Sequence, residues 1–392
     1  MPFRAVCAWC MVVAAPPQAR RRRWVRFAPL IHPIGVAPCP PPRLEGTVPL
    51  PDGRRLGYAE YGDPNGSLVL WFHGTPGGRR QIPLVGRRAA AELGLRLVCV
   101  ERPGVGDSTD HAYPRILDWA ADAAEVADHL GHERFMIVGL SGGGPYALAC
   151  AHDLPVRVVA VALLGSVAPA ADDQVAVEGP VALTRRWGGL LRTVRHPLGF
   201  CLSNLARLVE PVGLPALFAF AHVVPEGDRR VLHDAEVQSM FLDDLFVGTT
   251  RQCRAVLHDL ALFGRPWGFE LADVRVPVHW WHGDVDPFVP LAEARRAAAL
   301  LPDVEFVVRH DESHLGEFAA ADKVLAVLAQ DWDACASGDR HAPGDRHAPG
   351  HGTRADTDTN AGTGTDRKTG TDTGTGTGTS TAPQSRPATP VP

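Results

Sequence analysis

Three residues with the potential for joint chemistry, a serine, an aspartate and a histidine, lie far apart along the chain. Ser141 stands in Gly139-Leu140-Ser141-Gly142-Gly143, between an apolar run that predicts a strand and a run that predicts a helix. At such a sharp turn, small neighbours let the serine project its hydroxyl, and the N–H of Gly142 points where a negatively charged oxygen would form. Ser141 is therefore a candidate nucleophile.

A serine hydroxyl is a poor nucleophile at neutral pH, so it needs a general base, and the base needs an orienting acid. We expect both after downstream strands, because ligands meet the carboxyl ends of the strands in a parallel sheet. Asp286 follows a predicted strand at 276–281, and His314 follows another at 304–308. These two residues are the candidate acid and base.

Nearby polar residues leave alternatives open. Asp284 could orient the base in place of Asp286, and His310 could replace His314 as the base. The other histidines at strand ends are interpreted as structural, namely His73, His279 and His282. Asp107 is expected to brace the glycine-rich loop that contains it.

Alternating strands and helices would position these residues. The predicted strands are residues 44–50, 54–61, 68–72, 95–100, 135–138, 156–164, 276–281 and 304–308. The predicted helices are residues 79–92, 116–130, 144–151, 291–301 and 319–332. Buried strands that alternate with amphipathic helices favour an α/β fold with a mostly parallel sheet covered on both faces.

This alternation stops after Gly165. Residues 168–263 read as several helices without a good buried strand, which is too long for a connecting loop. We interpret them as a helical lid over the strand ends, with an ordinary helical subdomain as the alternative. The aromatic residues of this segment favour a hydrophobic ligand, and they are Trp187, Phe218, Phe220, Phe241 and Phe246.

The 392 residues thus divide into four parts. Residues 43–167 and 264–336 are predicted to form the core around the lid at 168–263. Residues 1–42 are interpreted as a disordered or mis-assigned start, with a targeting segment as the alternative. Residues 337–392 are repetitive and rich in glycine and threonine, which predicts a disordered tail.

Composition narrows the classes of partner. The net charge of −5 argues against a nucleic-acid partner, and no apolar run is long enough to predict a stable membrane span. The eight scattered cysteines are interpreted as free thiols, which favours a cytoplasmic protein. No metal-ligand set or dinucleotide-binding glycine pattern emerges, so no metal or cofactor is expected.

From about Arg43 to Trp332 the sequence resembles the α/β-hydrolase superfamily. The motifs HGTPG, GLSGG, HGDVDPFVP and SHLG occur in order, and ERPG and RPWGF resemble the lid-bearing hydrolases abundant in actinobacteria. The resemblance implies an α/β-hydrolase fold with Ser141 as nucleophile, Asp286 as acid and His314 as base. It also implies oxyanion N–H groups from Thr75 and Gly142.

The expected function is that of a serine hydrolase, in which a triad and an acyl-enzyme cleave an ester or related acyl bond of a small, hydrophobic molecule. Proline-iminopeptidase-like action is the nearest rival, although its elbow usually carries tryptophan where Gly142 stands. Candidate lid acids for gripping an amine are Glu210, Glu226, Glu236, Asp243 and Asp244. Other α/β-hydrolase chemistry and a non-catalytic ligand-binding protein stay open, as does the oligomeric state.

Overall fold

An eight-stranded sheet organises the computed structural model, which describes residues 39–169, 226–244 and 253–338 with isolated positions between 189 and 201. The strands are β1 (Leu44–Pro49), β2 (Arg55–Gly62), β3 (Ser67–Phe72), β4 (Leu95–Val100), β5 (Phe135–Leu140), β6 (Val158–Leu164), β7 (Val278–Gly283) and β8 (Val304–Arg309). They lie in the order β1-β2-β4-β3-β5-β6-β7-β8. Only the β1–β2 and β2–β4 pairs of this sheet are antiparallel. The predicted mostly parallel sheet is confirmed.

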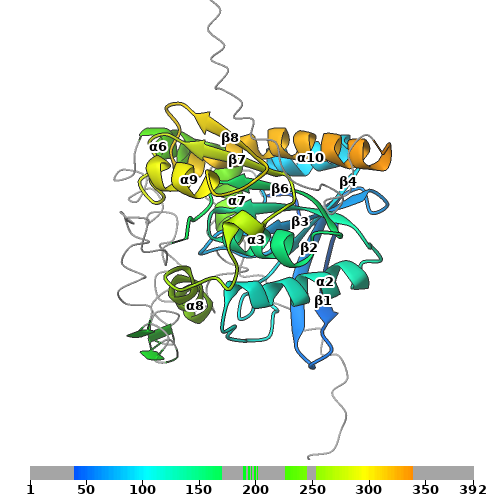
Figure 1. The fold of residues 1–392 in the computed structure, drawn as a ribbon, viewed down its shortest axis with the longest axis vertical. Helices are drawn as coiled ribbons and strands as arrows, with labels where there is room; N and C mark the ends of the chain where they lie inside the picture. Colours follow the sequence, from blue (N-terminus) through cyan, green and yellow to red (C-terminus); the bar gives the residue numbers. More distant parts are fainter. Residues whose placement is uncertain are drawn as a thin grey trace, which may run out of the picture. The chain divides into compact units, whose positions relative to one another are not determined.

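Helices cover both faces of this sheet (Figure 1). On one face, α1 (Leu84–Glu92) packs beside α10 (Ala321–Ala336). The other face is covered by α2 (Trp119–His129), α3 (Gly144–Asp153) and α9 (Leu291–Ala298). Short 3-10 turns complete these elements, namely η1 (Ile116–Asp118), η2 (Ser141–Gly143), η5 (Leu271–Asp273) and η6 (His314–Ala320).

Each central strand feeds two cores, one on each face. In β3, Leu70 and Phe72 belong to the core under α2 and α3, whereas Val69 and Trp71 belong to the core under α1 and α10. Side chains alternate across a strand, so a strand covered on both sides must be apolar at every position. This explains the continuous hydrophobic runs in the sequence.

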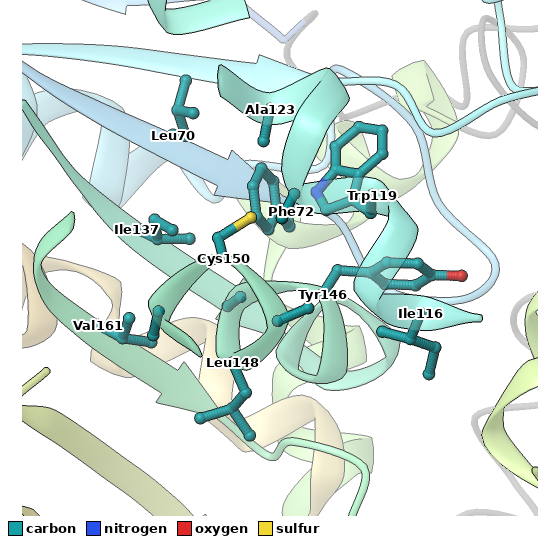
Figure 2. Close-up of a cluster of buried hydrophobic side chains, with 14 of the residues drawn as sticks. Leu70, Phe72, Ile116, Trp119, Ala123, Ile137, Tyr146, Leu148, Cys150 and Val161 are labelled. Carbon is teal, nitrogen blue, oxygen red and sulfur yellow. The ribbon is translucent and has the colours of Figure 1, made fainter. Parts of the chain in front are cut away.

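Aromatic rings fill the core beneath the candidate site (Figure 2). Phe72 from β3 meets Trp119 from α2 edge to face, with ring centroids 5.4 Å apart. Trp119 in turn meets Tyr146 from α3, with ring centroids 6.0 Å apart. Such edge-to-face pairs add about 0.5–1.5 kcal/mol beyond the burial of their area. The helix that follows Ser141 is therefore firmly seated on the sheet.

The predicted helix at 79–92 is wrong at its start, because α1 begins only at Leu84. Pro83 precedes the helix in an extended conformation, and proline disfavours helical geometry in the residue before it. Arg79 is nine-tenths buried and donates to Glu101 over 2.8 Å, so its side chain faces the core instead of solvent. Residues 79–83 thus form a loop near the carboxyl end of β4.

Three described helices lie between β6 and β7: α6 (Glu226–His233), α7 (Ala235–Asp244) and α8 (Cys253–Phe263). We call this stretch between the two strands the helical insertion. Of the aromatic residues predicted for the lid, only Phe241 falls within the described residues. The predicted disordered start and tail lie almost wholly outside them. No helix in the described ranges has the length and apolar character to cross a bilayer.

Candidate active site

Loops at the carboxyl ends of four parallel strands bring the predicted site residues to one edge of the sheet. Thr75 follows β3, Ser141 follows β5, Asp286 follows β7 and His314 follows β8. Since β3, β5, β7 and β8 run parallel through their neighbours, their ends face the same side. The topology therefore gathers residues that are more than 200 positions apart in the chain.

The turn that carries Ser141 is strained and tightly packed. Ser141 has a φ of 49°, in the left-handed region that non-glycine residues rarely occupy. A Cβ atom on Gly143 would lie 2.1 Å from the carbonyl oxygen of Phe72, and one on Gly139 would lie 2.7 Å from the Cα of Gly144. Only glycine fits at both positions, which is what a sharp strand-to-helix turn requires.

A hydrogen-bonded relay joins the three candidate residues. The Ser141 hydroxyl donates to Nε2 of His314 over 2.8 Å, and Nδ1–H of His314 donates to Oδ2 of Asp286 over 2.7 Å. The other Asp286 oxygen accepts the backbone N–H groups of Phe288 and Val289 over 2.8 and 3.0 Å. The carboxylate is thus fixed on one side while it orients the imidazole on the other.

Burial and charge shift the pKa values of His314 and Asp286 in opposite directions. Burial lowers the pKa of His314, but the adjacent negative charge of Asp286 and its hydrogen bond outweigh burial, so the pKa is raised above its ordinary value. Burial raises the pKa of Asp286, yet the charge and hydrogen bond of His314 bring it below its ordinary value. The carboxylate is therefore charged near neutral pH, and its charge makes the His314 imidazole a stronger base.

The two alternative residues pair with each other. Nδ1 of His310 lies 3.0 Å from Oδ2 of Asp284, and the N–H of Asp311 donates to Oδ1 of Asp284 over 2.9 Å. The His310 side chain is 82% exposed. The relay to Ser141 is made by Asp286 and His314 instead.

Two other histidines are held away from Ser141. Nε2–H of His282 donates to the carbonyl of Val289 over 2.8 Å, and burial lowers the pKa of this imidazole. His279 lies between two carboxylates, at 2.9 Å from Glu305 and 2.6 Å from Asp331. These contacts fit the structural interpretation of both residues.

The two predicted oxyanion residues are neighbours. A Cβ atom on Gly142 would lie 2.4 Å from Oγ1 of Thr75, so the backbone of Gly142 lies close against the Thr75 side chain. Within the described residues, no carbonyl accepts a hydrogen bond from the Thr75 N–H. Gln81 braces this loop, because it accepts the Gly74 N–H over 2.7 Å and donates to the Pro76 carbonyl over 3.0 Å.

A cavity of about 360 Å³ opens over Ser141. It is bounded by the strand-end loops, by η6 and by helices of the insertion. Apolar side chains dominate its wall, which includes Leu140, Val167, Leu232, Phe241, Leu260, Phe263, Phe288, Val289, Leu315 and Phe318. His314 is the one ionisable side chain among the described lining residues. The cavity therefore suits an uncharged, apolar ligand.

Comparison with known proteins agrees with this architecture. A family profile for the α/β-hydrolase fold matches residues 67–194. An esterase from Thermogutta terrifontis superposes with a TM-score of 0.53 at 21% identity, over 74% of this chain and 98% of that one. The chain has the α/β-hydrolase fold.

Two curated proteins that are similar to this chain differ in how far the similarity extends. A proline iminopeptidase of Xanthomonas citri is 33% identical over 115 residues, which cover 29% of this chain and 36% of that protein. A poly(3-hydroxyalkanoate) depolymerase of Ectopseudomonas oleovorans is 23% identical over 301 residues, which cover 74% of this chain and 92% of that protein. In each of three iminopeptidases that this chain matches, the similarity covers about two fifths of the length of that protein.

The described candidate lid acids have partners away from the cavity. Three form ion pairs at 2.7–2.9 Å, namely Glu226 with Arg229, Glu236 with Arg88 and Asp243 with Arg80. Asp244 is buried and accepts the backbone N–H groups of Gly78 and Arg80 over 3.0 and 3.1 Å. Glu210 lies outside the described residues.

Sequence reasoning missed an ion pair beside the site. Nη2 of Arg102 lies 2.8 Å from Oδ2 of Asp259, and their side chains are 3% and 8% exposed. Arg102 lies two residues after the end of β4, so its place near a strand end was a usable signal. Asp259 sits in the middle of α8, where an acid among apolar residues at helical spacing marks a buried charge that needs a partner.

Proposed function

We propose that this chain is a serine hydrolase that cleaves an ester or related acyl bond of a small, apolar substrate through an acyl-enzyme. The observation that carries the proposal is the relay from Ser141 through His314 to Asp286, with links of 2.8 and 2.7 Å, at the floor of an apolar cavity. A nucleophile, a base and an orienting acid in hydrogen-bond contact are what acyl transfer needs.

In the acylation step, His314 Nε2 takes the proton of Ser141 as Oγ attacks the substrate carbonyl. Asp286 keeps Nδ1 protonated and stabilises the imidazolium that forms. The N–H groups of Thr75 and Gly142 hold the negatively charged oxygen, and loss of one such donor costs about 2.7–4 kcal/mol of barrier.

Collapse of the tetrahedral intermediate breaks the bond to the leaving group, which receives the proton from Nε2 of His314. The same nitrogen then takes a proton from water, whose oxygen attacks the acyl-enzyme carbonyl. When this second tetrahedral intermediate collapses, the bond between the acyl carbon and Oγ of Ser141 breaks, Oγ takes the proton back from Nε2 of His314, and the acid leaves.

The size and lining of the cavity support a small substrate. A volume of about 360 Å³ corresponds to about a dozen water molecules at roughly 30 Å³ each. An apolar wall gains about 25 cal/mol for each Å² of apolar substrate surface that it buries, whereas an unpaired ammonium group would be desolvated at high cost. Uncharged acyl groups are therefore favoured.

Three observations favour ester cleavage over iminopeptidase action. The four described candidate acids are paired elsewhere, so they do not serve to grip a substrate amine. A side chain on Gly142, where iminopeptidases usually carry tryptophan, would collide with Thr75 and Phe263. The polyester depolymerase matches over most of its own length, whereas the iminopeptidase match covers 36% of that protein.

A substrate panel with active-site labelling tests this proposal. The purified full-length chain is assayed on p-nitrophenyl acetate, butyrate and octanoate and on proline p-nitroanilide, and it is treated with a fluorophosphonate probe. We expect turnover of the esters, little turnover of the anilide, and labelling that Ser141→Ala abolishes. Faster anilide cleavage would favour the iminopeptidase reading. Absence of both turnover and labelling would favour a binding protein.

A further inference from the structure

The Arg102–Asp259 ion pair lies directly against the loop that carries Thr75. Asp259 Oδ2 receives Nε and Nη2 of Arg102 over 3.1 and 2.8 Å and the Thr75 hydroxyl over 2.7 Å. Its other oxygen accepts the Tyr146 hydroxyl over 2.7 Å. Burial raises the pKa of Asp259, but the charge of Arg102 and these hydrogen bonds bring it below its ordinary value, so the carboxylate is charged.

Arg102 also grips the backbone of the same loop. Nη1 donates to the carbonyl of His73 over 2.5 Å, and Nη2 donates to the carbonyl of Gly74 over 2.9 Å. Nδ1–H of His73 donates to the same Gly74 carbonyl over 2.8 Å. Burial lowers the pKa of His73 to about 3, so this imidazole is neutral and its tautomer is set by that bond.

Holding the Gly74 carbonyl fixes the direction of the Thr75 N–H. The two groups belong to one planar trans peptide, in which C=O and N–H point in opposite directions. With the carbonyl turned toward Arg102 and His73, the N–H is turned away from them. Both Gly74 and Thr75 line the cavity over Ser141.

The Thr75 hydroxyl is hydrogen-bonded within the protein and plays a different role from the Thr75 N–H. It accepts from Nη2 of Arg102 over 2.8 Å and donates its only proton to Asp259. It therefore has no proton to give to a substrate oxygen, and Thr75 contributes through its backbone N–H.

We propose that Asp259, on helix α8 of the insertion, is a positioning residue for the oxyanion hole. It neutralises Arg102 and anchors the Thr75 hydroxyl, and the pair holds the Gly74–Thr75 peptide with its N–H toward the reacting centre. This inference rests on the proposed hydrolase function. It ties a helix of the insertion to the stabilisation of the transition state without contact between Asp259 and the substrate.

Kinetics of four variants test the role. Asp259→Asn removes the charge that balances Arg102, and Thr75→Val removes the anchored hydroxyl while keeping the shape of the side chain. Misplacing a reacting group by about 1 Å costs about 100-fold, so we expect kcat for p-nitrophenyl butyrate to fall about 10- to 100-fold with KM changed less than about threefold. The rate of fluorophosphonate labelling should fall in step. Thr75→Ser, which keeps the hydroxyl, should recover at least about a third of kcat.

Tyr113→Phe is the matched control. The Tyr113 hydroxyl, like that of Thr75, donates to a buried aspartate that is paired with an arginine. Here the aspartate is Asp122 and the arginine is Arg54, and neither lines the cavity. We expect a loss of melting temperature similar to that of Thr75→Val, with kcat unchanged. If Asp259→Asn does not fold, Thr75→Val decides the question.

The outcomes separate this inference from the proposed function. A folded Thr75→Val with wild-type kcat, or a Thr75→Ser as impaired as Thr75→Val, would overturn the positioning role while wild-type turnover upholds the hydrolase. A wild-type protein that neither turns over esters nor labels at Ser141 would overturn both.

Discussion

Adding a single methyl group at Gly142 should be enough to disable the site. The new Cβ atom would lie 2.4 Å from Oγ1 of Thr75, 2.8 Å from its Cβ and 2.9 Å from Cζ of Phe263. Ordinary contacts begin near 3.4 Å, so the elbow and the Thr75 loop must separate by about 1 Å. Thr75 cannot shift freely, because Arg102 and Asp259 hold its hydroxyl.

The size of the effect follows from that displacement. Spreading two oxyanion donors by about 1 Å costs about 100-fold in kcat, or about 2.7 kcal/mol of barrier. Overpacking a buried site also costs about 1–3 kcal/mol of folding stability. We therefore expect Gly142→Ala to lower kcat about 100-fold and to lower the melting temperature.

The assay is kcat and KM on p-nitrophenyl butyrate together with thermal melting. Gly86→Ala is the matched control, since its Cβ would press on the Cβ of Ala321 at 3.0 Å, between α1 and α10 and away from the cavity. It should lose stability but keep kcat. If Gly142→Ala kept kcat within about threefold of wild type, the claim that this contact sets the oxyanion geometry would be refuted.

The relay and the cavity wall lead to three more expected results. His314 must be neutral to accept a proton, and Asp286 raises the pKa of this imidazole above its ordinary value, so kcat/KM should fall as the pH drops through that raised pKa. In a pH–rate profile, Asp286→Asn should move the acidic fall of kcat/KM to lower pH and reduce kcat by about 10⁴-fold. An acidic fall at the same pH as in the wild type would contradict the assignment of Asp286 as the acid of the triad. Phe241→Ala should enlarge the cavity and raise the octanoate-to-acetate ratio of kcat/KM about tenfold, with Phe241→Leu as the milder control. Ser141→Ala should abolish fluorophosphonate labelling and nearly all ester turnover while the melting temperature is maintained. If this variant hydrolysed esters at the wild-type rate, Ser141 would be excluded as the nucleophile.

The sequence was informative wherever a residue's role follows from its place at a strand end. Ser141, Asp286 and His314 each lie in the segment that follows a strand, and the parallel sheet brings the ends of these three strands to a common edge. The choice between Asp286 and Asp284 was open in the sequence, because a difference of two positions in a loop has no periodic signature. Only the folded loop shows that Asp284 turns toward His310.

Other features depend on contacts that no local pattern records. Arg102 and Asp259 meet across 157 positions, one from a loop and one from a helix of the insertion. The helix predicted from Arg79 fails because a distant carboxylate, Glu101, draws that arginine into the interior. In both cases a buried charge found its partner through tertiary packing, which overrides local propensity.

The attachment of the insertion also bears on how such a protein could be re-engineered. β6 and β7 pair in parallel, with Val161 opposite Val278 and Leu164 opposite Trp281, although the whole insertion separates them in the chain. We therefore expect a foreign segment grafted between these strands to leave their register intact. Because Asp259 reaches Thr75 from α8, a chimera that keeps residues from Cys253 onward should retain its catalytic rate while it acquires a new acyl preference.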